Sequence, residues 1–137
     1  MSRATRLMAG LILVVVPTIE LGGSFLLSAL IDRDSGYMTN ALRQNFFRAG
    51  HAHAGVLLLL SLLYYIFLDR TALAASVKQT ACVALFVGIL AQSGGFFLHM
   101  ALGKPKRGSI GTTVTIAGAV MLACAVIALV YGLITTP

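Results

Sequence analysis

Long apolar runs dominate the chain, and short polar stretches separate them. Four of these runs are long enough to cross about 30 Å of hydrocarbon as α-helices, because a helix rises about 1.5 Å per residue. The pattern therefore predicts an all-α integral membrane protein, a bundle of four transmembrane helices. The 137 residues leave room for a single domain without a soluble part, with predicted spans at 7–31, 49–68, 80–102 and 111–133.

Composition agrees with this pattern, since 58% of the residues are hydrophobic and 10% are charged. These values lie outside the range of ordinary soluble domains. The net charge of +6 does not indicate a nucleic-acid partner, because Lys and Arg are scattered over the span ends without a basic stripe. The lipid bilayer is the expected partner. The apolar run after Arg3 and Arg6 is longer than the core of a signal peptide, so we expect Met1 to begin the mature protein.

The positions of Lys and Arg near the span ends also predict an orientation. The first and third connections hold six of these residues, whereas the termini and the second connection hold four. This difference favours termini outside the cell and places the opposite end, which carries the histidines, in the cytoplasm. The expected location is a bacterial inner membrane.

One acidic residue lies near the middle of the first span. At this depth a charge costs at least about 3 kcal/mol, so we expect Glu20 to be protonated, paired or beside water. Ser24 and Ser28 follow at intervals of four residues and lie on the same helix face. Two roles stay open for Glu20: a hydrogen-bonded packing residue or a functional group.

The remaining segments carry further structural signals. The longest connection, 32–48, contains a predicted short interfacial helix at 39–47, with Thr39 or Asn40 as its cap. Tyr64 and Tyr65, near the far end of the second span, fit an aromatic belt at the membrane surface. The break at the end of the third span is assigned to Pro105. Small residues of the fourth span form a face suited to close helix contact: Gly111, Thr115 and Gly118.

The three histidines gather at one predicted membrane surface. His51 and His53 open the second span, and His99 closes the antiparallel third span, on the same helix face as Gln92. Two residues at positions i and i+2 lie about 200° apart around a helix, so His51 and His53 cannot both bind one metal ion. This spacing, with no carboxylate nearby, argues against a zinc site.

A haem needs only one correctly oriented histidine. Gly50 and Gly55 would let a flat macrocycle approach the backbone, and Arg48 is suited to pair with its propionates. The residues alone leave another interpretation open for each histidine, because an imidazole one turn inside the membrane also serves as a hydrogen-bonded packing residue.

Two stretches resemble a known family. The run 48–55, which ends His53-Ala54-Gly55, resembles the Arg-Ala-His-x-Gly stretch at the start of the second span in styrene oxide isomerases, which are small four-span membrane enzymes. The end of that family's third span and its short loop are similar to a second stretch here, Gly95-Phe96-Phe97-Leu98 followed by Pro105-Lys106-Arg107-Gly108. The length, the number of spans and the place of the longest connection also match.

This resemblance implies a cofactor, an assembly and a reaction. It implies haem b bound through a single histidine, which is His53 by alignment, with His51 as the second candidate. It also implies a homotrimer with haem near the subunit interface. Ferric iron would act as a Lewis acid that opens a small apolar epoxide, and a hydride shift would give an aldehyde without net redox change.

The chain departs from that family at three positions. Phe97 stands where the family has its catalytic tyrosine, and Ser93 and Leu59 stand where it has asparagines. These replacements remove groups that would orient an epoxide. The resemblance therefore implies haem binding more directly than it implies isomerase activity.

Three classes of function follow from these observations. The first is a haem-dependent epoxide isomerase, for which the expected pocket residues are Glu20, Gln92, Phe96, Phe97 and His99. The second is a haem protein for electron transfer or gas sensing, in which His51 or His99 supplies a further axial ligand. The third is a non-enzymatic membrane subunit whose polar residues serve helix packing and partner binding.

Overall fold

The structure, a computed structural model, describes residues 1–104 and 106–137. These residues form four long helices and one short 3-10 turn, without a strand. All four long helices are apolar and long enough to cross a membrane. The predicted all-α integral membrane bundle of four helices is therefore confirmed. The elements are α1 (Arg3–Ile31), η1 (Arg33–Ser35), α2 (Ala41–Asp69), α3 (Ala75–Leu102) and α4 (Ile110–Thr135).

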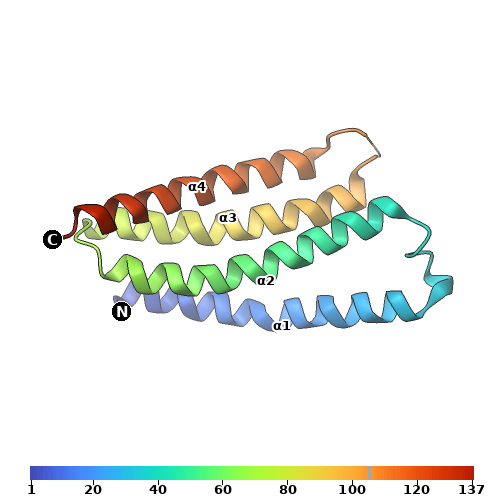
Figure 1. The fold of residues 1–137 in the computed structure, drawn as a ribbon, viewed down its shortest axis with the longest axis horizontal. Coiled ribbons are helices and arrows are strands. Elements are labelled where there is room, and N and C mark those ends of the chain that lie inside the picture. Colours follow the sequence, from blue (N-terminus) through green and yellow to red (C-terminus); the bar gives the residue numbers. More distant parts are fainter. Residues whose placement is uncertain (105) are drawn as a thin grey trace.

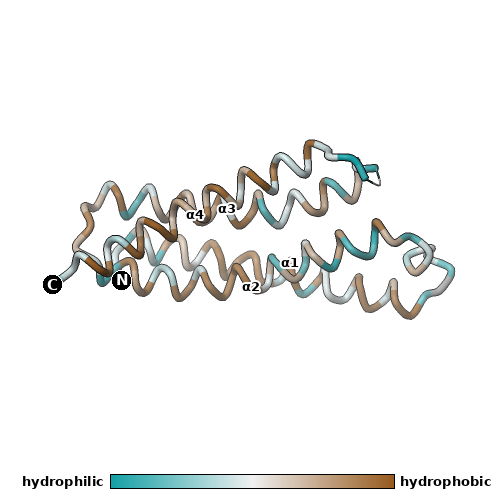
Figure 2. The backbone as a smooth tube through the Cα atoms, turned by 45° about the horizontal axis from the view of Figure 1, so that its top comes forward, coloured by the Kyte–Doolittle hydropathy of each residue, from teal (hydrophilic) through white to brown (hydrophobic). Residues whose placement is uncertain are grey.

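Successive helices lie beside one another and run in opposite directions, so α1 and α4 occupy opposite sides of the bundle (Figure 1). Both termini and the α2–α3 connection lie at one end. The α1–α2 and α3–α4 connections lie at the other end, which we call the histidine end because His51, His53 and His99 belong to its half of the bundle. Figure 2 shows hydrophobic residues along all four helices and hydrophilic residues gathered in the α3–α4 connection.

All four helices extend past the predicted spans, because the polar residues that flank the apolar runs also continue the helices. The separate interfacial helix predicted at 39–47 is wrong: residues 41–47 form the first turns of α2, since nothing in them interrupts a helix. Asn40 caps α2 as predicted, and its side-chain oxygen accepts a hydrogen bond from the Arg43 N–H at 3.0 Å. The break assigned to Pro105 lies outside the described residues.

The contact between α3 and α4 is the closest in the bundle, because glycines let the two backbones approach. A Cβ atom added at Gly95 would lie 2.6 Å from the Gly111 carbonyl oxygen, and one added at Gly118 would lie 2.8 Å from the Gly88 carbonyl oxygen. Thr115 also lies directly against Gly95. The small-residue face predicted for the fourth span is confirmed.

The two tyrosines expected at the membrane surface are buried instead. Tyr64 is 5% exposed and Tyr65 is fully buried. The Tyr64 hydroxyl donates a hydrogen bond to the Ala125 carbonyl of α4 at 2.8 Å. The prediction of an aromatic belt was wrong because it considered only depth, whereas both side chains lie on a face of α2 that packs inside the bundle.

At the end that carries the termini, α1 is attached to α2 by hydrogen bonds. The Asp69 carboxylate accepts one from the Thr5 hydroxyl at 2.7 Å and one from the Ser2 N–H at 2.9 Å. At the histidine end, Phe25 of α1 packs against Phe47 of α2, with ring centroids 5.4 Å apart. These two contacts hold the ends of α1, and a cavity lies between them.

Candidate functional site

His51 and His53 face different neighbours. The His51 ring lies against α1, where a Cβ atom added at Gly22 would be 3.3 Å from its Nδ1. The His53 ring lies against Phe96 of α3, with ring centroids 4.8 Å apart. Both rings are half-buried. The structure therefore puts these two histidines in two separate environments.

The hydrogen bond of His53 determines which ring nitrogen is free. Its Nδ1 lies 2.8 Å from the carbonyl oxygen of Ala49, one turn earlier in α2. A carbonyl oxygen only accepts, so Nδ1 carries the proton of the neutral ring and Nε2 keeps its lone pair. Histidines that bind metals are commonly held in this way, with one nitrogen on a backbone carbonyl and the other on the metal.

Small side chains surround His53 on the outer surface of α2. Ala49 is half-buried, and Ala52 and Val56 are exposed. Arg48 is also exposed, but it lies five residues before His53 and about 140° around the helix from it. A Cβ atom added at Gly55 would meet nothing within 4 Å, but Gly55 lies about 200° around the helix from His53. Gly55 therefore belongs to the side of α2 that carries His51.

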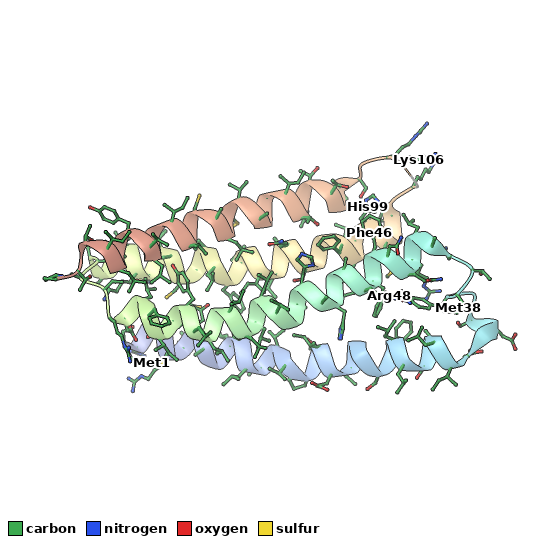
Figure 3. All side chains as sticks on the ribbon, viewed as in Figure 1. Met1, Met38, Phe46, Arg48, His99 and Lys106 are labelled. Atoms are coloured by element: carbon green, nitrogen blue, oxygen red, sulfur yellow. The ribbon has the colours of Figure 1, made fainter. Side chains whose placement is uncertain are left out.

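A row of aromatic rings connects His53 with His99. Phe96 lies between His53 and Phe46, and its ring centroid is 6.1 Å from that of Phe46. Phe46 in turn stacks on His99 with centroids 4.2 Å apart, as Figure 3 shows at the histidine end. Two phenylalanines thus separate the two histidines.

His99 joins the end of α3 to the start of α4. The ring is 4% exposed, and its Nδ1 lies 2.7 Å from the Ser109 hydroxyl and 3.1 Å from the Thr112 hydroxyl. Ser109 and Thr112 also form the capping box of α4. These contacts give His99 a packing role that the sequence had left open.

The other expected pocket residues lie apart from His53. The backbone of Gln92 packs against Gly118, and its carbonyl accepts a hydrogen bond from the Thr115 hydroxyl at 3.4 Å. Glu20 is exposed on the outer surface of α1, as are Ser24 and Ser28. Of the five expected pocket residues, Phe97 alone is among those that line the cavity described next.

The cavity lies between α1, α2 and α3, is partly open to the outside of the bundle and has a volume of about 370 Å³. His51 lines it from α2, Gly22 from α1, and Ser93 and Phe97 from α3. Ser93 is 6% exposed, and its hydroxyl has no hydrogen-bond partner within the described residues.

Reasoning from the sequence alone missed this cavity, because the register of spans 1 and 2 depends on a contact that a single sequence does not show. Spans 1 and 2 are antiparallel, so the contact of Phe25 with Phe47 fixes their register. Counting equal steps from that pair brings Gly22 and Gly23 close to His51. A sequence also does not show that the hydroxyl of Ser93 is unpaired.

Among the described residues, no three side chains of His, Cys, Asp or Glu come close enough to hold one metal ion. A haem site with one protein ligand is not subject to this condition, since the porphyrin supplies the equatorial ligands.

Comparison of the chain with protein-family models, with curated proteins and with solved structures found no match. The fold defines the class of the protein as an integral membrane bundle of four helices, and its function is inferred from the residues above.

Proposed function

We propose that this protein binds haem b, with Nε2 of His53 as the axial ligand of the iron. The observation that supports the proposal is the hydrogen bond from His53 Nδ1 to the Ala49 carbonyl, which in the neutral ring leaves the lone pair of Nε2 free. The side chains next to His53, Ala49 and Ala52, are small enough for a flat macrocycle to approach α2. The exposed guanidinium of Arg48 is suited to pair with a propionate.

The positions of the other histidines favour a single protein ligand. His51 contacts α1 on a different side of α2, and the Nδ1 of His99 contacts hydroxyls at the start of α4. Neither ring lies beside His53, so one coordination position would stay open. An open position suits a reaction better than electron transfer, for which a second axial ligand is usual.

We propose as the activity the rearrangement of a small apolar epoxide to a carbonyl compound, without net redox change. When bound, ferric haem would supply the Lewis acid. The protein contributes apolar surroundings: Phe96 lies beside His53, Phe46 lies next to Phe96, and both rings would exclude water. Without water, the opened epoxide rearranges instead of being hydrated to a diol.

Turnover by the haem-loaded protein tests this activity. We expect a small aryl epoxide to give an aldehyde in the ferric state, and we expect dithionite or His53→Ala to abolish the product. A five-coordinate ferric spectrum should accompany the activity. A diol product, or no turnover by fully loaded ferric protein, would contradict the isomerase proposal, and a six-coordinate low-spin spectrum would favour electron transfer.

We propose further that the protein is a homo-oligomer, specifically a homotrimer. Glu20 lies near the middle of α1 and is exposed on its outer surface together with Ser24 and Ser28. An ionised carboxyl group facing lipid at this depth would cost at least about 3 kcal/mol. A second copy packed on this polar face would relieve the cost and also cover a haem on the outer surface of α2.

Substitution of this polar face tests the assembly. We expect Glu20→Leu to shift the detergent-solubilised protein from trimer to monomer in mass measurements. Leu21→Ala, at a neighbouring exposed position, serves as the control and should leave the mass unchanged. A wild-type protein that is already monomeric would overturn this part of the proposal.

The proposed location is a bacterial inner membrane with the histidine end in the cytoplasm. The support is the excess of Lys and Arg in the two connections at that end, six against four elsewhere. Lys106 lies in the exposed α3–α4 connection (Figure 3). We expect Lys106→Cys to react with an impermeant maleimide only after the cells are opened. Labelling in intact cells would show the opposite orientation.

A further inference from the structure

We infer that the cavity between α1, α2 and α3 is a second binding site, separate from His53, for a small neutral molecule. This molecule is largely apolar and carries one hydroxyl or carbonyl oxygen. The inference goes beyond the proposed haem site, because none of its steps requires haem.

The first support is the size and lining of the cavity. An apolar cavity of about 150 Å³ is known to bind benzene, and this one has a volume of about 370 Å³. It therefore has room for two fused rings. Its lining is mainly aliphatic and aromatic, with Ile19, Phe25 and Phe97 among the contributing residues. The described lining contains no Asp, Glu, Lys or Arg, so a charged ligand would lack a counter-charge.

The second support is the hydroxyl of Ser93. Helical serines and threonines inside apolar surroundings usually bond to a carbonyl of the preceding turn. Ser61 and Thr18 follow this rule, and their hydroxyls donate to Leu58 and Val15 carbonyls, both at 2.6 Å. Ser93 is buried, lines the cavity and has no such partner within the described residues. Its hydroxyl is therefore available to a ligand.

His51 adds a second polar group that is open to a ligand, whereas the Thr18 hydroxyl, which also lines the cavity, is bonded to the Val15 carbonyl. The ring rests against Gly22 and Gly23; a Cβ atom at Gly22 would crowd its Nδ1 at 3.3 Å, whereas one at Gly23 would make an ordinary contact at 3.6 Å. The glycine pair thus leaves space for an imidazole that lines the cavity. An imidazole and a hydroxyl can each donate or accept, so together they suit an alcohol, a phenol or a ketone.

The test compares two probes of nearly equal size, 2-naphthol and naphthalene. The protein as purified is placed in lipid nanodiscs, and retention of each probe is measured by equilibrium dialysis against empty nanodiscs. We expect specific retention of 2-naphthol by the wild type. We expect Ser93→Ala to weaken 2-naphthol binding about tenfold and to leave naphthalene unchanged, since it removes one hydrogen bond. The matched control is Ser61→Ala, whose hydroxyl lies outside the cavity.

Two further variants separate this site from the haem site. Ala54→Phe places a large side chain in the cavity and should abolish retention of both probes. His53→Ala should lose haem and keep 2-naphthol. Equal retention by wild-type and empty nanodiscs, or equal effects of Ser93→Ala and Ser61→Ala, would overturn the inference. A haem-free wild type that still binds 2-naphthol would contradict only the haem proposal.

Discussion

The α3–α4 side and the α1 side of the bundle are packed in different ways. Between α3 and α4, glycines bring the two backbones into direct contact, and the His99 ring joins them at one end. By contrast, α1 is held by Asp69 at one end, by the buried Ile12 in the apolar core and by Phe47 at the other end, and a cavity lies beside it. Close packing gives a rigid support, whereas looser packing leaves space that a ligand can occupy.

The helix between these two sides carries both candidate sites. On α2, His53 faces Phe96 and the outer surface, and His51 faces the cavity and α1. The two histidines therefore face different environments from opposite sides of one helical turn. Substitutions on either side of the bundle should consequently affect stability and binding separately.

The largest expected effect is on the tightly packed side. Gly95→Ala places a methyl group against the α4 backbone, and we expect a loss of about 3 kcal/mol in the free energy of unfolding. Gly94→Ala is the control, because an added Cβ meets nothing within 4 Å there. The control should be neutral or gain up to about 1 kcal/mol from helix propensity. Unfolding in mixed micelles measures both, and equal effects would contradict the described packing.

The next largest effect on stability is expected where His99 connects the end of α3 to the start of α4. His99→Ala removes the hydrogen bonds to Ser109 and Thr112, and we expect a loss of about 2 kcal/mol in the free energy of unfolding. Haem binding should be unchanged, because His99 is separated from His53 by two phenylalanines. Loss of haem without loss of stability would instead identify His99 as a ligand.

The smallest effect on the free energy of unfolding is expected where α1 is hydrogen-bonded to Asp69 of α2. Thr5→Val removes a hydrogen bond to the Asp69 carboxylate, which is worth about 1.5 kcal/mol. Thr18→Val is the control, because that hydroxyl bonds within its own helix. We expect hydrogen exchange of α1 amides to increase in the Thr5 variant while α3 amides stay protected. Equal increases in both helices would show that the two sides open together.

The sequence predicted those features that depend on runs of residues or on spacing. Apolar runs indicated the four spans, and the spacing of Gly111, Thr115 and Gly118 indicated the close face of α4. Depth in the membrane was a poor guide to burial, however, since the direction that a side chain takes from its helix decides whether it is covered. Tyr64 and Tyr65 were misplaced for that reason.

The candidate site was predicted less completely. The separation of His51 from His53 followed from helix geometry alone. The hydrogen bond of His53 and the unpaired hydroxyl of Ser93 depend on contacts between particular atoms, and a single sequence does not specify these. The cavity depends on how α1 packs against α2 and α3, and this packing is a property of the whole bundle. Haem and isomerase activity stay predictions.

The most direct test of the central claim is the visible absorption spectrum of the purified protein, wild type beside His51→Ala, His53→Ala and His99→Ala. The proposal predicts a Soret band in the wild type that only His53→Ala abolishes. Equal folding of the variants, checked by circular dichroism, would assign that loss to the iron ligand. A colourless wild type that takes up no added haem, or a Soret band that survives His53→Ala, would contradict the claim.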